Sequence, residues 1–138
     1  MKLALVLVLV LGCARSHVTA CADDLEGTWR DDAGERWMLL DHDGVIEGYP
    51  IFADSIGSDV RGAPRSLQLH REGDRLAGLV VRRYDHRADS CDARAPVTAT
   101  CGDDALELQL GDPAAPASFA PCKLLPPPPP HAERWHRE

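Results

Sequence analysis

Aromatic residues are scarce in this sequence, where they make up 5% of 138 positions. A hydrophobic core must therefore rest on leucine and valine, in a chain whose size predicts one small domain. No C-x-x-C pair occurs, so neither a thioredoxin-like redox site nor a zinc ribbon is indicated. Polybasic patches are lacking as well, and the formal net charge is −7. This acidic balance argues against nucleic acid and against anionic lipid headgroups as partners.

A run of apolar residues long enough to cross a membrane is also lacking. The stretch LALVLVLVLG, which follows Lys2, is too short for a hydrocarbon core that needs about 20 apolar residues. Residues 1–12 therefore have the form of a secretory signal peptide and not of an anchor helix. An ordinary signal peptide, cleaved after Ala20 or Ala22, is one interpretation, and the end of the stretch favours another.

The stretch ends in Val10-Leu11-Gly12-Cys13, which resembles the lipobox of bacterial lipoproteins. The resemblance implies cleavage before Cys13, a thioether-linked diacylglycerol on its sulfur and an acylated new N-terminus. Ala14 follows in place of the aspartate that can favour inner-membrane retention, so the resemblance further implies the outer membrane of a bacterial cell envelope. Several acyl chains would anchor a soluble domain to the membrane through this N-terminal lipid.

The other four cysteines form an even set, as expected of disulfides in an exported chain. The disulfide candidates are Cys21, Cys91, Cys101 and Cys122. Four cysteines allow three pairings. Strands that alternate in direction would put all of them except Cys91 at one end of the domain. This favours Cys101 with Cys122 and Cys21 with Cys91, while a bridge from Cys21 to Cys122 would close the ends of the domain equally well.

Apolar and polar residues alternate through the middle of the chain and do not recur at helical spacing, apart from one turn within 53–59. ALELQL at 105–110 has the pattern of a half-buried strand, and RLAGLVV at 75–81 that of a central strand. Asp43-Gly44, Gly73-Asp74 and Gly102-Asp103-Asp104 mark turns, because glycine takes positive φ without steric cost. Together with LEGTWRD, VTATC and SFAPC, the pattern gives about eight short strands. Closure would protect their edges, which predicts a single small antiparallel up-and-down β-barrel or barrel-like sandwich, stapled by disulfides.

Four segments follow from these patterns. Residues 1–12 are the signal peptide, 13–24 a lipidated tether, 25–123 the β domain and 124–138 a proline-rich disordered tail. The five consecutive prolines at 126–130 favour an extended polyproline II rod that acts as a stiff spacer, with a ligand for an aromatic groove as the alternative.

The opening of the β domain, LEGTWRDDAGERWMLLDHDGVIEGYP at 25–50, resembles the first three strands of avidin and lipocalin barrels. The matching residues are Gly27, Thr28 and Trp29, then Asp43-Gly44, then Gly48 and Tyr49. The resemblance implies a barrel whose first tryptophan plugs the floor. Asp31 and Glu35 stand where avidins have the asparagine and serine that bind the biotin ureido group, so biotin binding is not carried over.

Three stretches hold residues with reactive or metal-binding side chains. Asp41-His42-Asp43-Gly44 suggests a calcium loop, but Phe52 stands where the glutamate of an EF-hand would be, so a hairpin turn is preferred. The stretch YDHRADSCD at 84–92 is predicted to be the longest loop on one rim, and it lacks a nucleophile elbow around Ser90. The glycine-rich stretch 53–64 is predicted to be a long connecting loop. The arginines Arg82, Arg83 and Arg87 are expected in surface ion pairs.

The sequence thus predicts no catalytic residue, no cofactor and no metal. The preferred function is a structural or protein-interaction β module whose interior is filled by leucine, with rim loops or the proline tail as its contact surface. The alternative is a calycin-like barrel with a small-molecule ligand in a cavity. A hydrolase is third, because it would need His42, His70 or His86 to meet a carboxylate and a serine. The expected partners are the membrane, through the lipid, and an envelope protein or small molecule.

Overall fold

The computed structural model describes residues 21, 23–51, 65–102 and 104–138, and within these ranges the chain forms strands and no helix. The strands are β1 (Gly27–Asp31), β2 (Arg36–His42), β3 (Val45–Ile51), β4 (Arg65–Glu72), β5 (Arg75–His86), β6 (Asp89–Cys101), β7 (Ala105–Leu110), β8 (Pro116–Phe119), β9 (Cys122–Leu124) and β10 (His131–Arg137). The predicted all-β class is confirmed. The signal peptide at 1–12, the lipidated Cys13 and the turn within 53–59 lie outside the described residues.

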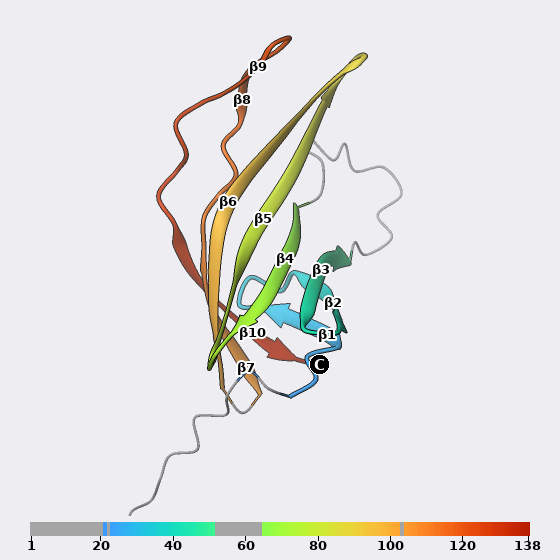
Figure 1. Cartoon of the computed structure of the whole chain (residues 1–138), viewed down its shortest axis with the longest axis vertical. Helices are drawn as coiled ribbons and strands as arrows, with labels where there is room; N and C mark the ends of the chain where they lie inside the picture. Colours follow the sequence, from blue (N-terminus) through green and yellow to red (C-terminus); the bar gives the residue numbers. More distant parts are fainter. Residues whose placement is uncertain (1–20, 22, 52–64, 103) are drawn as a thin grey trace, which may run out of the picture.

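Eight strands close into an antiparallel barrel in the order β1-β10-β7-β6-β5-β4-β3-β2, with β2 paired to β1 (Figure 1). Apart from the closing pair of β1 and β10, neighbours in the barrel follow one another along the chain, and β8 with β9 forms a separate two-stranded sheet between β7 and β10. The predicted up-and-down barrel is therefore confirmed. Its closure leaves the barrel without an unpaired edge strand.

Tight turns connect the strands where the sequence supplies glycine. Asp43 and Gly44, in the turn between β2 and β3, have φ angles of 51° and 86°. Gly73 has a φ of 65° in the turn between β4 and β5. These two predicted hairpins are confirmed, and glycine fits them because it adopts positive φ without a clash.

Side chains fill the interior of the barrel. Trp37 and Trp135 stack there with their ring centroids 4.7 Å apart, and each residue is 1% exposed. The largest fully buried side chains are those of Trp37, Trp135, Leu39, Ile46, Leu67, Leu69, Leu76, Leu106, Leu108, Leu110, Val80 and Val97. An eight-stranded barrel is just wide enough for such side chains to occupy its interior. Leucine supplies most of this core, as the low aromatic content predicts.

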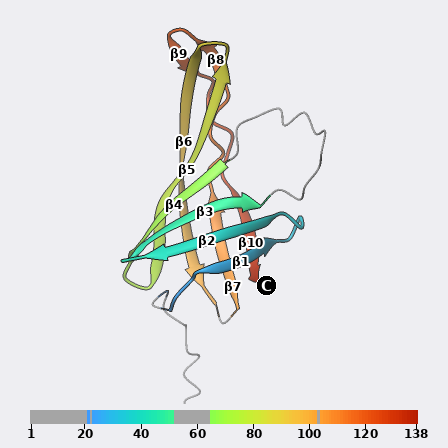
Figure 2. The ribbon, with the colours of Figure 1, turned by 90° about the vertical axis from the view of Figure 1, so that its right-hand side faces the viewer.

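Strands β5 and β6 have 12 and 13 residues, and their outer halves run past the end of the barrel (Figures 1 and 2). The hairpin of β8 and β9 lies beside them, joined by a disulfide between Cys91 on β6 and Cys122 on β9. We call this projection, made of residues 82–93 and 111–130, the arm. The chain leaves the barrel after β7, forms part of the arm and returns as β10.

Both predicted boundaries of the β domain are wrong. Residues 124–138 are not a disordered tail, because β10 pairs with β1 and β7 and closes the barrel. The sequence of β10, HAERWHR, does not have the alternating pattern of a barrel strand, because Trp135 is its only buried residue, and five prolines precede it. At the other boundary, Cys21 is buried and bonded to Cys101, so the domain begins within the predicted tether of 13–24.

The loop predicted at 84–92 and the preferred disulfide pairings are also wrong. Strand β5 continues to His86 and β6 begins at Asp89, which leaves a two-residue turn. The disulfides join Cys21 to Cys101 and Cys91 to Cys122. The strand count behind the prediction failed because Cys122 belongs to β9, which lies outside the barrel beside the far end of β6.

Candidate functional site

The end of the barrel nearest Cys21, which we call the floor, is closed by the segment that leads into β1. Arg71 on β4 donates hydrogen bonds to Asp41 Oδ1 at 2.9 Å and to the backbone oxygens of Cys21 and Asp23. Asp41 also accepts the backbone N–H of Leu25 at 3.0 Å. The Asp41 side chain is 7% exposed, and its hydrogen bond with Arg71 lowers its pKa from the ordinary value. These bonds fasten the entering chain to the barrel.

A cavity of 60 Å³ lies at the floor, with Leu25, Trp29, Leu106 and Arg137 among its lining residues. The Arg137 guanidinium lies 5.1 Å from the centre of the Trp29 ring, and the Trp29 indole N–H donates to the Leu25 carbonyl at 3.0 Å. Sites for small molecules have volumes of about 300 to 1,000 Å³. This cavity has room for water and is too small for such a ligand.

The opposite end of the barrel, the mouth, carries two arginines at directly facing positions. Arg65 on β4 pairs with Arg82 on β5, and both alternate in step with inward residues of their strands. Arg65 bonds to Glu35 at 3.1 Å and lies 5.5 Å from the centre of the Trp37 ring. Arg82 reaches the Tyr84 hydroxyl at 3.3 Å and forms no ion pair with any described residue. Like charges placed opposite one another are unfavourable, and here the carboxylates of Glu35 and of Glu133, 4.0 Å from the Arg65 guanidinium, balance Arg65.

Two buried nitrogen atoms of the described side chains have no hydrogen-bond partner, and both adjoin Arg65. They are Nε1 of Trp37, whose ring lies under the Arg65 guanidinium, and Nε of Arg82, which faces Arg65 across the strands. Each carries an N–H, so the mouth has donors in excess of acceptors. A buried donor without a partner costs about 1 to 3 kcal/mol. An oxygen-bearing group would satisfy these donors.

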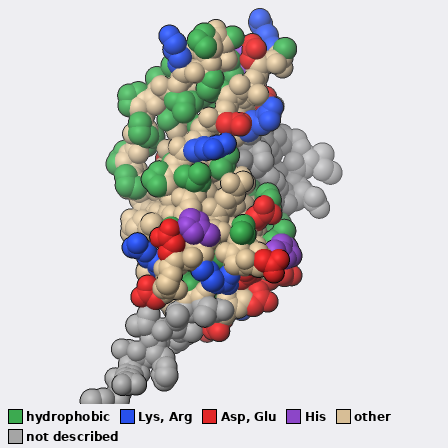
Figure 3. Space-filling model, in the orientation of Figure 1, with side chains coloured by type: hydrophobic (Ala, Val, Ile, Leu, Met, Phe, Trp, Pro, Cys, Tyr) green, Lys and Arg blue, Asp and Glu red, His purple; other side chains and the backbone are tan. Residues whose placement is uncertain are grey.

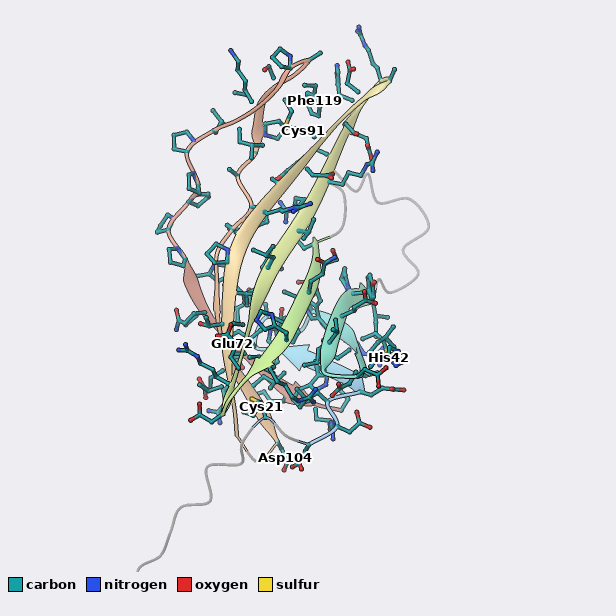
Figure 4. The ribbon with its side chains drawn as sticks, in the orientation of Figure 1. Cys21, His42, Glu72, Cys91, Asp104 and Phe119 are labelled. Carbon is teal, nitrogen blue, oxygen red and sulfur yellow. A yellow bond between two sulfur atoms is a disulfide. The ribbon has the colours of Figure 1, made fainter. Side chains whose placement is uncertain are left out.

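The arm has a small core of its own beyond the mouth. Its outgoing segment, 111–115, packs on β6, where the Gly111 N–H donates to the Pro96 carbonyl at 2.8 Å and Ala114 is 5% exposed. The His86 ring lies 5.2 Å from the Phe119 ring, so the tip of β5 contacts β8. The Cys91 disulfide adds a covalent link at the same level (Figure 4).

The histidines named for a hydrolase do not converge. His42 lies on the barrel, and His86 contacts Phe119 at the far end of the arm (Figure 4). His70 pairs with Glu72 at 2.9 Å on the exposed end of β4. At the tip of the arm, Arg83 binds a carboxylate and a serine hydroxyl, those of Asp85 at 3.1 Å and of Ser90 at 3.0 Å. The arginine therefore holds the carboxylate and the hydroxyl in a surface network, and neither group hydrogen-bonds to an imidazole of the described residues.

Other residues that the sequence singled out have structural roles. Asp41 in the calcium-like stretch is occupied by Arg71, and the following residues form the hairpin turn. Asp31 accepts the Glu35 backbone N–H at 2.7 Å, which fixes the turn between β1 and β2. No group of three or more histidine, cysteine, aspartate or glutamate side chains that could hold a metal ion occurs in the part of the chain that the structure describes.

No family model, curated protein or solved structure matches this chain. Among the described residues there is no helix with the length and apolar character needed to span a membrane. The class of protein that the structure defines is a small disulfide-stapled antiparallel β-barrel with a projecting arm. Arguments about its function rest on the floor, the mouth and the arm.

Proposed function

We propose that this chain is an exported, lipid-anchored module of a bacterial envelope that binds another protein through its arm. One observation carries the proposal: the barrel interior is filled by its own side chains, while β5 and β6 extend beyond it and a disulfide holds β9 to them. The extended halves of these strands contribute nothing to the barrel core. A rigid projection of this kind suits contact with a partner, and the function is one of binding and not of catalysis.

The placement of the two disulfides supports an anchored orientation. Cys21 lies at the floor and Cys91 at the opposite end of the molecule (Figure 4). Cys13 lies eight positions before Cys21 in the sequence, and eight extended residues span at most about 28 Å. A lipid on Cys13 would therefore keep the floor near the membrane and direct the arm away from it. Disulfides of this kind persist in oxidising compartments.

The intact mass of the protein extracted from bacterial membranes tests export and anchoring. The expected mass begins at Cys13 and includes a diacylglycerol and an acyl group, and reduction adds four hydrogens. A Cys13→Ala variant should lose the lipid and leave the membrane fraction. A mature chain that begins near Ala22 without lipid would contradict the anchor.

Site-specific photo-crosslinking tests the arm as the binding surface. A benzophenone amino acid is placed at Phe119 on the arm, and the matched control is placed at Tyr49 on the barrel wall, where the tyrosine is 43% exposed. In intact cells of the source organism, we expect a discrete protein adduct from position 119 and none from position 49. Equal labelling from both positions, or none from the arm, would contradict the proposal.

A second function, binding of a small anionic ligand at the mouth, is favoured by the unpartnered N–H groups of Trp37 and Arg82. A carboxylate or phosphate group would offer acceptor oxygens to such donors and a counter-charge to Arg82, which forms no ion pair with a described residue. The observation that favours this second function is the pair of buried N–H groups at the mouth that have no hydrogen-bond acceptor.

Nuclear magnetic resonance titration with acetate and with inorganic phosphate distinguishes this candidate. At about 10 mM, enough to detect a Kd near 1 mM, either anion should shift the indole N–H signal of Trp37. Arg82→Gln should remove the shift. Arg83→Gln should keep it, because the neighbouring Arg83 side chain is 61% exposed and pairs with Asp85. An unmoved Trp37 signal with both anions would eliminate the second function.

A further inference from the structure

The return path of the arm, from β9 to β10, carries a row of exposed apolar residues. Leu124 and Leu125 are 42% and 49% exposed, and the five prolines at 126–130 are all exposed. Figure 3 shows hydrophobic side chains gathered along the arm. We call residues 124–130 the proline ridge. Seven consecutive apolar residues on a surface call for a physical reason, because exposed apolar patches mark interaction sites.

The conformation of the ridge is fixed from both ends. The Leu125 N–H donates to the Ala115 carbonyl at 2.9 Å, and His131 pairs with Leu110 where β10 begins. Between these points, each proline holds its own φ near −65° and restricts the residue before it to an extended conformation. The prolines therefore follow a polyproline II path with three residues per turn. Such a segment loses little conformational entropy when a partner binds it.

Neither a spacer nor an edge guard explains five prolines here. The outgoing segment, 111–115, covers the same gap between barrel and arm in five residues with a single proline, Pro113, and it does so while packed on β6. Stiffness is therefore not required to cross the gap. Proline and lysine do protect strand edges, but β9 ends at Leu124, before the prolines begin. The ridge therefore exposes apolar side chains that neither the barrel nor the arm requires for its fold.

The charge around the ridge indicates the nature of its partner. In a protein of net charge −7, Lys123 is the only charged residue between Asp112 and His131. It lies on β9, directly before the ridge, and is exposed. Polyproline II segments dock in grooves lined by aromatic side chains, and a flanking cation sets their orientation on a groove with an acidic border.

We propose that the proline ridge is the ligand segment of the arm and docks in an aromatic-lined groove of a partner protein, with Lys123 opposite acidic side chains at the border of that groove. The inference rests on the proposed function of the arm as a protein-binding surface. It adds the residues in contact and the chemistry of the partner.

The test uses the mature, disulfide-bonded chain and three isolated probe domains with aromatic polyproline II grooves: an SH3, a WW and an EVH1 domain, each with acidic residues beside the groove. Calorimetric titration should give at least one Kd below about 100 μM. Pro127→Ala with Pro130→Ala, one turn apart on one face of the rod, should weaken that binding about tenfold, with unchanged near-ultraviolet circular dichroism. Lys123→Glu should also weaken it, and Arg83→Glu, a matched charge reversal on the other side of the arm, should not.

Binding by none of the three domains would overturn the inference, and so would binding that the double proline variant leaves unchanged. The same double variant, combined with the photo-crosslinker at Phe119, separates the two proposals. If the adduct persists without the prolines, the arm is a binding surface and the ridge is not its ligand. Suppose instead that the protein with its prolines intact gives no adduct from position 119 and still binds a probe domain in a proline-dependent way. In that case the ridge inference stands, and the crosslinking result excludes a partner contact at β8.

Discussion

Replacing Arg71 with methionine, Arg71→Met, should strongly destabilise the barrel. The side chain donates four hydrogen bonds, two to the Asp41 carboxylate and one each to the carbonyls of Cys21 and Asp23. Methionine keeps much of the apolar stem and removes every donor. The Asp41 carboxylate, whose side chain is 7% exposed, would then lose both hydrogen bonds from Arg71 and keep the one from the Leu25 backbone N–H.

The magnitude follows from this loss. Breaking a buried ion pair by removing one partner costs about 3 to 5 kcal/mol, because the remaining charge stays buried without compensation. Arg71 is 23% exposed, so solvent replaces part of its interaction and the lower end, about 3 kcal/mol, is expected. Arg71→Met combined with Asp41→Leu should lose less than the two single substitutions together, because no charge is then left unpaired.

Urea unfolding at neutral pH, followed by tryptophan fluorescence with both disulfides intact, measures this loss as a change in midpoint at constant slope. Arg75→Met is the matched control, since that side chain is 59% exposed and lies 3.8 Å from Glu72. It should cost less than about 0.5 kcal/mol. Equal losses for the two methionine variants would refute the reasoning.

The pH dependence has a defined sign. Arg71 lowers the pKa of Asp41 in the folded protein, so the ion pair adds stability above the ordinary value of 3.8 and this stability disappears as the pH falls through the lower, folded value. The difference in unfolding free energy between the wild type and Arg71→Met should therefore shrink in that acidic range and remain constant near neutral pH.

Three further changes test other parts of the structure. Gly78→Ala should cost at least about 2 kcal/mol in urea, because a Cβ there would lie 1.9 Å from a backbone oxygen of β4, whereas Gly102→Ala, with 3.5 Å of clearance, should be nearly neutral. The double substitution Cys91→Ser with Cys122→Ser removes a disulfide that joins positions 31 residues apart, and in the chain-entropy model this lowers the free energy of unfolding by roughly 3 to 4 kcal/mol. Hydrogen exchange should become faster in β8 and β9 and stay slow in the barrel. Faster exchange throughout the chain would contradict an arm that is held independently of the barrel. Trp135→Ala should cost about 3 to 5 kcal/mol and abolish the circular dichroism signal of the stacked indoles, and a signal that survives would exclude that pair as its origin.

The barrel could be predicted because its strands carry their own signals. SLQLH in β4 and ALELQL in β7 alternate in hydrophobicity, and glycine turns mark where strands such as β4 end. The arm and β10 lack those signals. The outer half of β5 reads RRYDH, with no alternating apolar face, and β10 has one large buried residue, Trp135. Their positions depend on pairing with strands that are distant in the sequence.

The residues at the two ends of the barrel could not be assigned from the sequence for a related reason. Asp41 and Arg71 are 30 residues apart on β2 and β4, which are separated by β3, so their contact depends on the pairing of all three strands. The facing pair of Arg65 and Arg82 depends on the exact register of β4 and β5. A shift of one residue would turn these side chains to the outer face.

The closing pair of strands also determines when the barrel can be completed as the chain folds. Strand β10 supplies the last barrel strand, and its junction with β1 joins residues as far as 108 positions apart. A chain that emerges from its N-terminus exposes β1 and β7 as open edges until residues 131–137 arrive, and open edges promote aggregation. Contacts of such long sequence separation form slowly. Because Trp135 meets Trp37 in the same event, the appearance of the stacked indole signal during refolding would time the closure of the barrel.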